Sequence, residues 1–113
     1  MATITTPLQA RLDALRERID AACVKAGRAS DSVILVAVGK TFPTSAIREA
    51  MDAGQRHFGE NYLQESVAKI AALAGVPNAP DLTWHFIGPI QSNKTRPIAQ
   101  NFQWVHTIDR EKI

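Results

Sequence analysis

Cysteine is almost absent from this sequence. The 113 residues include a single cysteine, Cys23. One cysteine excludes an internal disulfide and a cysteine-rich metal site, and it fits a protein that works in the reducing cytoplasm. No three residues of the His, Asp, Glu and Cys types have the spacing of metal ligands, so we predict no metal. Cys23 continues the apolar stripe of a predicted helix, which favours a core position over a role as a nucleophile.

Long apolar runs and a strong charge of one sign are also missing. No run approaches the roughly 18 residues that a membrane span needs, and the start, MATITTPLQA, does not resemble a secretory signal. The formal net charge is only +2, with the basic residues scattered along the chain, which gives little support for nucleic-acid binding. We therefore expect a cytoplasmic protein whose partners include neither a membrane nor a nucleic acid.

The sequence does contain an alternation of helical and strand patterns. Apolar residues recur at helical spacing in some segments, and continuous β-branched runs typical of buried parallel strands occur between them. The predicted strands are 32–38, 56–58, 82–88 and 103–108. The predicted helices are 7–26 with Thr6 as its cap and Gly27 as its stop, 44–53 with Thr44 as its cap and Gly54 as its stop, 60–75, 92–102, and one that begins at the cap Asp109.

Three of these helices have a clear apolar face. The expected inward residues are Leu8, Leu12, Leu15, Ile19 and Cys23 in the first helix, Ala46, Ile47, Ala50 and Met51 in the second, and Leu63, Val67, Ile70, Ala71 and Ala74 in the third. The Glu–Lys and Glu–Arg pairs on the helices are expected to face solvent. The length of the chain is sufficient for one small domain with its own core.

One helix followed by four strand–helix units predicts an α/β fold with parallel strands and right-handed crossovers. Two architectures fit this order, an open doubly wound sheet and an arc of an eightfold barrel. A four-unit arc has unpaired edge strands. The layout therefore suggests the first part of a longer protein, or a fragment that self-associates through exposed sheet edges.

The first strand runs into the sequence Gly39-Lys40-Thr41, the tail of a phosphate-binding loop. That motif needs a further glycine at position 34, which is Ile34, so the phosphate-loop interpretation is rejected. Two interpretations of Lys40 remain open. It could cap the strand in solvent, or, with its pKa lowered by burial at the functional edge of a parallel sheet, its amine could form a Schiff base.

Polar residues also follow the next two strands. Asn61 comes after the second strand, where it could cap a helix or face a ligand. His85 lies within the third strand, where a hydrogen-bonded core histidine is the ordinary alternative to a binding role. His57 and His106 have no distinguishing setting in the sequence, and we assign them no role.

Longer motifs carry a resemblance to a known family. The segments VAVGKTFP, AIREAMDAGQRHFGENYLQE, WHFIGPIQSNK and VHTIDREKI, within residues 34–113, resemble the pyridoxal phosphate homeostasis protein family, which is similar to the N-terminal barrel of alanine racemase. The resemblance implies the N-terminal half of a (β/α)8 TIM-type barrel of fold-type III, preceded by one extra helix, with residues 1–113 as a single partial domain. It also implies a cytoplasmic protein without established catalysis, which acts in vitamin B6 and amino-acid balance.

The same resemblance implies a cofactor and a site. The cofactor is pyridoxal 5′-phosphate, held as a Schiff base on Lys40, with Asn61 and His85 on the cofactor face. Two features depart from the family pattern: Gly39 stands where serine is usual, and the later glycine- and serine-rich loops that hold the phosphate lie beyond this chain. A racemase-like enzyme that uses the same cofactor is the alternative function, and a self-associating barrel fragment without cofactor is another.

Overall fold

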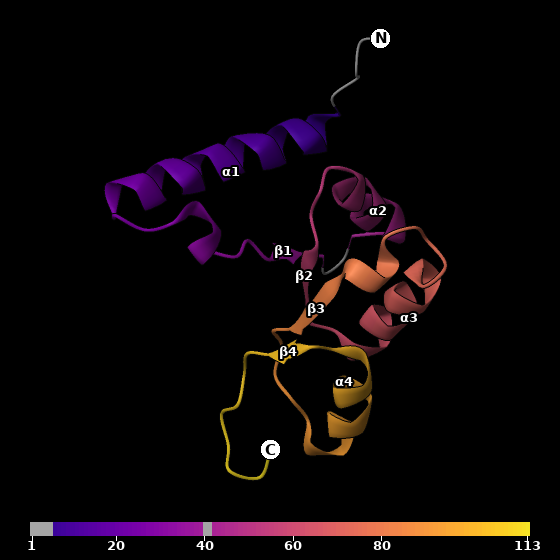
Figure 1. Ribbon diagram of the computed structural model, residues 1–113. Helices are drawn as coiled ribbons and strands as arrows, with labels where there is room; N and C mark the ends of the chain where they lie inside the picture. Colours follow the sequence, from indigo (N-terminus) through magenta and orange to yellow (C-terminus); the bar gives the residue numbers. More distant parts are fainter. Residues whose placement is uncertain (1–5, 40–41) are drawn as a thin grey trace.

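The computed structural model describes residues 6–39 and 42–113 (Figure 1). Its helices are α1 (Pro7–Lys25), α2 (Thr44–Asp52), α3 (Leu63–Leu73) and α4 (Thr95–Asn101), with short 3-10 helices η1 (Ser30–Ser32), η2 (Ala79–Asp81) and η3 (Ser92–Lys94). Its strands are β1 (Ala37–Val38), β2 (His57–Glu60), β3 (Thr83–Phe86) and β4 (Trp104–Val105).

The four strands form one parallel sheet in the order β1-β2-β3-β4. Figure 1 shows α2, α3 and α4 along the same side of this sheet. Right-handed crossovers between successive neighbours place every connecting helix on one face, whereas a doubly wound sheet reverses its strand order at a switch point. The predicted parallel α/β fold is therefore confirmed, and no reversal occurs among the described strands.

The core lies between the sheet and these helices. Alternate strand residues point to the helical side, and the aromatic ones pack in pairs, Phe58 with Trp84 at a centroid distance of 5.6 Å and Phe86 with Phe102 at 5.2 Å. The helices contribute buried aliphatic side chains that include Ile47, Met51, Leu73 and Ile98. Burial of each such side chain stabilises the fold by about 1.5–3 kcal/mol.

Helix α1 begins and ends as its sequence predicts. The Thr6 hydroxyl accepts a hydrogen bond from the Gln9 amide at 3.1 Å, and Gly27 adopts a φ of +68°, which suits a residue that follows a helix. Cys23 is buried, as predicted for a core residue. The apolar stripe is only partly covered, since Leu15 remains 38% exposed.

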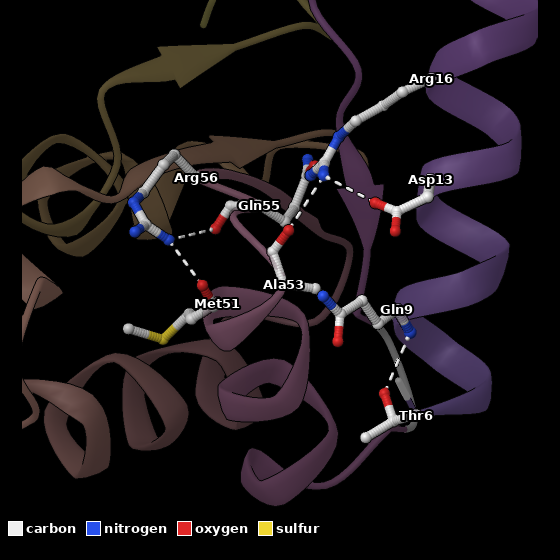
Figure 2. Close-up of polar contacts among 8 residues, drawn as sticks. All are labelled: Thr6, Gln9, Asp13, Arg16, Met51, Ala53, Gln55 and Arg56. Atoms are coloured by element: carbon white, nitrogen blue, oxygen red, sulfur yellow. Dashed lines mark hydrogen bonds and ion pairs between the residues drawn. The ribbon is translucent and has the colours of Figure 1, made fainter. Parts of the chain in front are cut away.

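The side chain of Gln55 fastens α1 to the amino-terminal edge of the sheet (Figure 2). Its Nε2 donates to the carbonyls of Leu35 at 2.7 Å and His57 at 2.8 Å, and its Oε1 accepts from Arg16 at 3.0 Å. Arg16 also donates to the Ala53 carbonyl at 2.9 Å. A buried amide with all these bonds made fixes the register of β1, β2 and α1 together.

The first predicted strand is much shorter than expected. Of residues 32–38 only Ala37 and Val38 form a strand, and Ile34 and Val38 are 59% and 44% exposed. Within the described residues β1 pairs with β2 alone, so its other edge and the face opposite the helices lack covering atoms. The prediction of a strand buried on both faces is therefore wrong for this chain.

The buried face of α3 also differs from the prediction. Ser66, Lys69 and Leu73 are buried, while Ala71 and Ala74 are exposed. Polar residues occupy this face because their groups find partners there: the Ser66 hydroxyl donates to the Tyr62 carbonyl, and Lys69 takes part in a buried ion pair.

Two predicted helix caps, Thr44 and Asp109, are wrong. Helix α2 begins at Thr44 itself, with Pro43 as its cap and no capping side chain. Residues 109–113 form a turn closed by the Ile113 amide and the Arg110 carbonyl at 3.2 Å, since so short a segment cannot offset the cost of helix nucleation.

Among residues 6–39 and 42–113, no helix is long and apolar enough to cross a membrane.

Candidate functional site at the carboxyl edge of the sheet

Parallel pairing brings the carboxyl ends of all four strands to one edge of the sheet. Gly39 follows β1 at this edge, is buried, and donates its amide to the Gly59 carbonyl at 2.9 Å. Lys40, the predicted Schiff-base residue, lies outside the described residues. The structure therefore describes the approach to Lys40 and not Lys40 itself.

The buried ammonium group of Lys69 binds the backbone of Gly39, the last described residue before Lys40. Lys69 of α3, which is 5% exposed, donates from Nζ to the Gly39 carbonyl and to Glu60 Oε1 at 3.1 Å. Its Nζ also lies 2.9 Å from Glu65 Oε1. Three acceptors match the three hydrogens of an ammonium group. Lys69 thus binds the peptide that leads into Lys40, which corrects the expectation that the helical Glu–Lys pairs face solvent.

Glu60 ends β2 and is fully buried, at 0% exposure. Burial raises the pKa of the Glu60 carboxyl from its ordinary value, and the hydrogen bond and positive charge of Lys69 only partly oppose this. The second carboxyl oxygen of Glu60, Oε2, has no hydrogen-bond partner among the described residues. A buried ion pair adds little net stability over apolar side chains of similar volume, although the loss of one partner alone is costly.

Asn61 lies directly after Glu60, in the turn between β2 and α3. It does not cap α3, whose cap is Tyr62 without a side-chain bond. The Asn61 side-chain oxygen is buried and has no hydrogen-bond partner in the described part of the chain. A buried acceptor without a donor is costly, and such an atom at a sheet edge is one that a ligand could satisfy.

Gly88 fixes the position of Asn61. A Cβ atom placed on Gly88 would lie 2.5 Å from the Asn61 carbonyl oxygen and 3.1 Å from its Cα atom. Both contacts are to backbone, which cannot swing away as a side-chain end could. The close approach of the two strand ends therefore requires glycine here.

We expect Gly88→Ala to destabilise the chain by about 1–3 kcal/mol, the usual cost of forcing extra volume into a packed site. Gly75→Ala is the matched control, because a Cβ atom there would meet nothing within 4 Å. Urea unfolding of both variants checks this. Equal midpoints for the two variants would show that the edge can relax around a methyl group.

His85 occupies the open side of the sheet, opposite the helices, and is 4% exposed. Its Nε2 lies 3.0 Å from Nδ1 of His57, and its Nδ1 lies 3.0 Å from Nε2 of His106. Its ring also stacks on that of Trp104, with centroids 6.2 Å apart and planes inclined by 10°. Both ring nitrogens of His85 are therefore occupied, and its ring is covered by its neighbours within the described structure.

Lowering the pH from about 7.5 to about 5.5 is expected to destabilise the fold. Burial, followed by the charges of His57 and His106, lowers the pKa of His85 below its ordinary value of 6.5. Between the lowered pKa and the ordinary one, the unfolded chain binds more protons, so stability falls as the pH falls. Urea midpoints measured across this range check the sign. His85→Phe should flatten the slope, and a steeper slope in that variant would contradict the assignment.

Asn61 and His85 are not in hydrogen-bond contact in the described structure. Gly59 is the residue that pairs with His85, and Asn61 lies two residues beyond it toward the carboxyl edge. No group of three or more His, Cys, Asp or Glu side chains within 6–39 and 42–113 could hold a metal ion. The described part of the site therefore consists of an orphaned amide oxygen, a buried ion pair and a covered imidazole.

Comparison with known proteins supports a single family. The chain is 56% identical over 106 residues to the pyridoxal phosphate homeostasis protein of Vibrio cholerae, an alignment that covers 94% of the chain and 45% of that relative. Among solved structures, PipY of Synechococcus elongatus without pyridoxal phosphate has a TM-score of 0.76 and 46% identity, over 91% of the chain and 42% of PipY. No family model matches.

A second structure of PipY, with pyridoxal phosphate bound, has a TM-score of 0.63 and 51% identity, over 69% of the chain and 36% of PipY. The fold is thus that of the parallel α/β proteins that PipY represents. The chain belongs to the pyridoxal phosphate homeostasis protein family, and it spans less than half the length of the curated relatives it matches.

Proposed function

We propose that this chain is the part of a pyridoxal-phosphate-binding (β/α)8 barrel that carries the cofactor lysine, and that it binds pyridoxal 5′-phosphate through a Schiff base on Lys40. The whole protein would hold the cofactor and contribute to vitamin B6 and amino-acid balance. The relatives' role in pyridoxal phosphate homeostasis, as their names state it, and the cofactor bound to PipY support this proposal.

The observation that carries the site proposal is the buried contact between Lys69 and the Gly39 carbonyl. In this contact the buried ammonium group of Lys69 binds Gly39, the residue that immediately precedes Lys40. Gly39 lies at the edge of the sheet where parallel α/β proteins bind ligands. The Asn61 oxygen gives the fit with the cofactor, because it is a buried acceptor without a donor. Pyridoxal phosphate offers a donor in its protonated ring nitrogen.

The residues have separate roles in this proposal. Lys40 forms the bond, which gives the protein a reversible hold on the aldehyde of the cofactor. Asn61 hydrogen-bonds the cofactor, and the buried His85, whose two nitrogens are occupied, supports the cofactor face from within the sheet. Lys69 and Glu60 hold Gly39 in place and do not touch the cofactor.

Exposed apolar side chains and unpaired strand edges of the sheet support the half-barrel proposal. Val38, Trp104 and Val105 are each more than 40% exposed, and β1 and β4 each have one paired edge among the described residues. Further strands of a barrel would cover these apolar groups. The chain's share of its relatives, 45% for the Vibrio cholerae protein, matches half a barrel. The buried free thiol of Cys23 supports a cytoplasmic location.

We propose binding rather than racemisation as the role. A racemase needs a proton donor on each face of the cofactor. The sequence has one tyrosine, Tyr62, which is 55% exposed, and His85 has no free ring nitrogen. With pyridoxal phosphate and L-alanine, the chain should form no D-alanine.

The experiment that tests the function is reductive capture. The chain is mixed with pyridoxal phosphate, reduced with borohydride and digested, and the modified peptides are identified by mass spectrometry. Capture suits a weak and reversible bond, because reduction makes it permanent. The proposal predicts one dominant adduct, on the peptide that contains Lys40. Equal labelling of the exposed lysines Lys25 and Lys112 would contradict it.

A further inference from the structure

Three imidazole rings stand in a row across the open side of the sheet. His57 is the first residue of β2, His85 lies within β3, and His106 follows directly after β4. The two N···N distances that join them are both 3.0 Å, and neighbouring ring centroids are 5.3 and 5.2 Å apart. Such distances are those of hydrogen bonds between ring nitrogens.

The hydrogens of the two N···N bridges, His57–His85 and His85–His106, can be placed in two ways. Each bridge takes one hydrogen, and each neutral imidazole has one N–H to give. Both bridges are therefore complete only when all three rings donate in the same direction along the row. In one arrangement His106 has the outward N–H, and in the other His57 has it.

The two ends of the row reach different edges of the sheet. His57 lies at the amino-terminal edge and lines a cavity of about 310 Å³ together with Arg16, Asp31 and Arg56. His106 is exposed and lies past the carboxyl end of β4. Only the central ring, that of His85, is shut off from water.

We propose that His57, His85 and His106 form a proton relay that connects the cavity at the amino-terminal edge with the carboxyl edge of the sheet. A proton binds the bare Nε2 of His57, and the Nδ1 proton of His57 moves to Nε2 of His85. The Nδ1 proton of His85 then moves to Nε2 of His106, and the Nδ1 proton of His106 leaves. One proton enters and one leaves, and the row ends in its opposite arrangement.

The charged groups around the row leave this path open. Beyond His106, the side chains of Asp109 and Arg110 are paired with each other at 3.3 Å. Glu60, the nearest carboxylate on β2, is bonded to Lys69 of α3 on the helical side. The only hydrogen-bond partners of the His85 ring in the described structure are the two other histidines.

Glutamine substitution separates a relay from a structural row. An amide can still donate and accept a hydrogen bond, but it cannot take up a proton and pass another on. In His57→Gln and His106→Gln the bridge to His85 can therefore persist while through-transfer stops. Trp104→Phe is the control, because it keeps an aromatic ring beside His85 and alters neither bridge.

The measurement is NMR of the ¹⁵N-labelled imidazoles in the whole chain, which gives the exchange of the His85 N–H with solvent. Exchange at the buried His85 should be fast in the unchanged chain and in Trp104→Phe, and severalfold slower in both glutamine variants. Unchanged exchange in both glutamine variants would overturn the relay. Should His57→Gln not fold, His106→Gln at the exposed end decides alone.

Discussion

Lys69→Met is expected to lower the free energy of unfolding by about 3–5 kcal/mol, because it leaves the buried Glu60 carboxylate without its cation. Glu60 is fully buried and Lys69 is 5% exposed, so water cannot replace the lost partner. The Gly39 carbonyl loses its donor in the same substitution. The pKa of Glu60, already raised by burial, should rise further once the charge of Lys69 is gone.

Two further variants separate this effect from a general loss of charge. Asp13→Ala breaks the ion pair between Asp13 and Arg16, which is partly exposed, and should cost less than about 1 kcal/mol. The double variant Glu60→Leu, Lys69→Met removes both buried charges and should recover most of the lost stability. Urea denaturation of all three provides the comparison. A double variant less stable than Lys69→Met would show that the unpaired Glu60 carboxylate is not the cause of the destabilisation.

Lys40→Ala is expected to remove the dominant adduct formed with pyridoxal phosphate and borohydride. The physical reason is that a Schiff base needs a primary amine placed beside the bound aldehyde, and alanine has none. Lys94→Ala is the matched control. Lys94 lines a groove of about 540 Å³ between α3 and α4 near the same edge, so its loss removes a nearby amine without touching the proposed anchor.

Intact-mass spectra of the reduced proteins check this prediction. The Lys94→Ala variant should retain the adduct of the unchanged chain, and Lys40→Ala should retain only scattered low-level labelling. If Lys40→Ala is labelled as well as the unchanged chain, another amine forms the bond and the anchor has been misassigned.

The sequence predicted those elements whose signals are local. Thr6 and Gly27 mark the ends of α1 because capping and a positive φ involve only nearby backbone. The alternation of strands and helices was sufficient to predict a parallel sheet. It could not predict that β1 is limited to Ala37 and Val38, because the burial and pairing of a strand depend on residues far along the chain.

The site was less predictable because its main contacts join distant residues. Lys69 reads as part of a solvent-facing pair with Glu65, and only the fold brings it to Gly39, thirty residues away. A glycine after an apolar strand, as at Gly88, was a usable signal of close approach, although it does not name Asn61 as the neighbour. His57 and His106 have no local pattern, since their meeting with His85 depends on strand register.

An NMR titration of the ¹⁵N-labelled chain with pyridoxal phosphate tests the central claim most directly, because it locates even weak binding. The claim is that the cofactor binds at the carboxyl edge of the sheet. We expect backbone amides of Gly39, Asn61 and Gly88 to shift, while Gln55 and Arg56 at the amino-terminal edge do not. Shifts centred on the amino-terminal edge or on α1, with the carboxyl edge unchanged, would contradict the account.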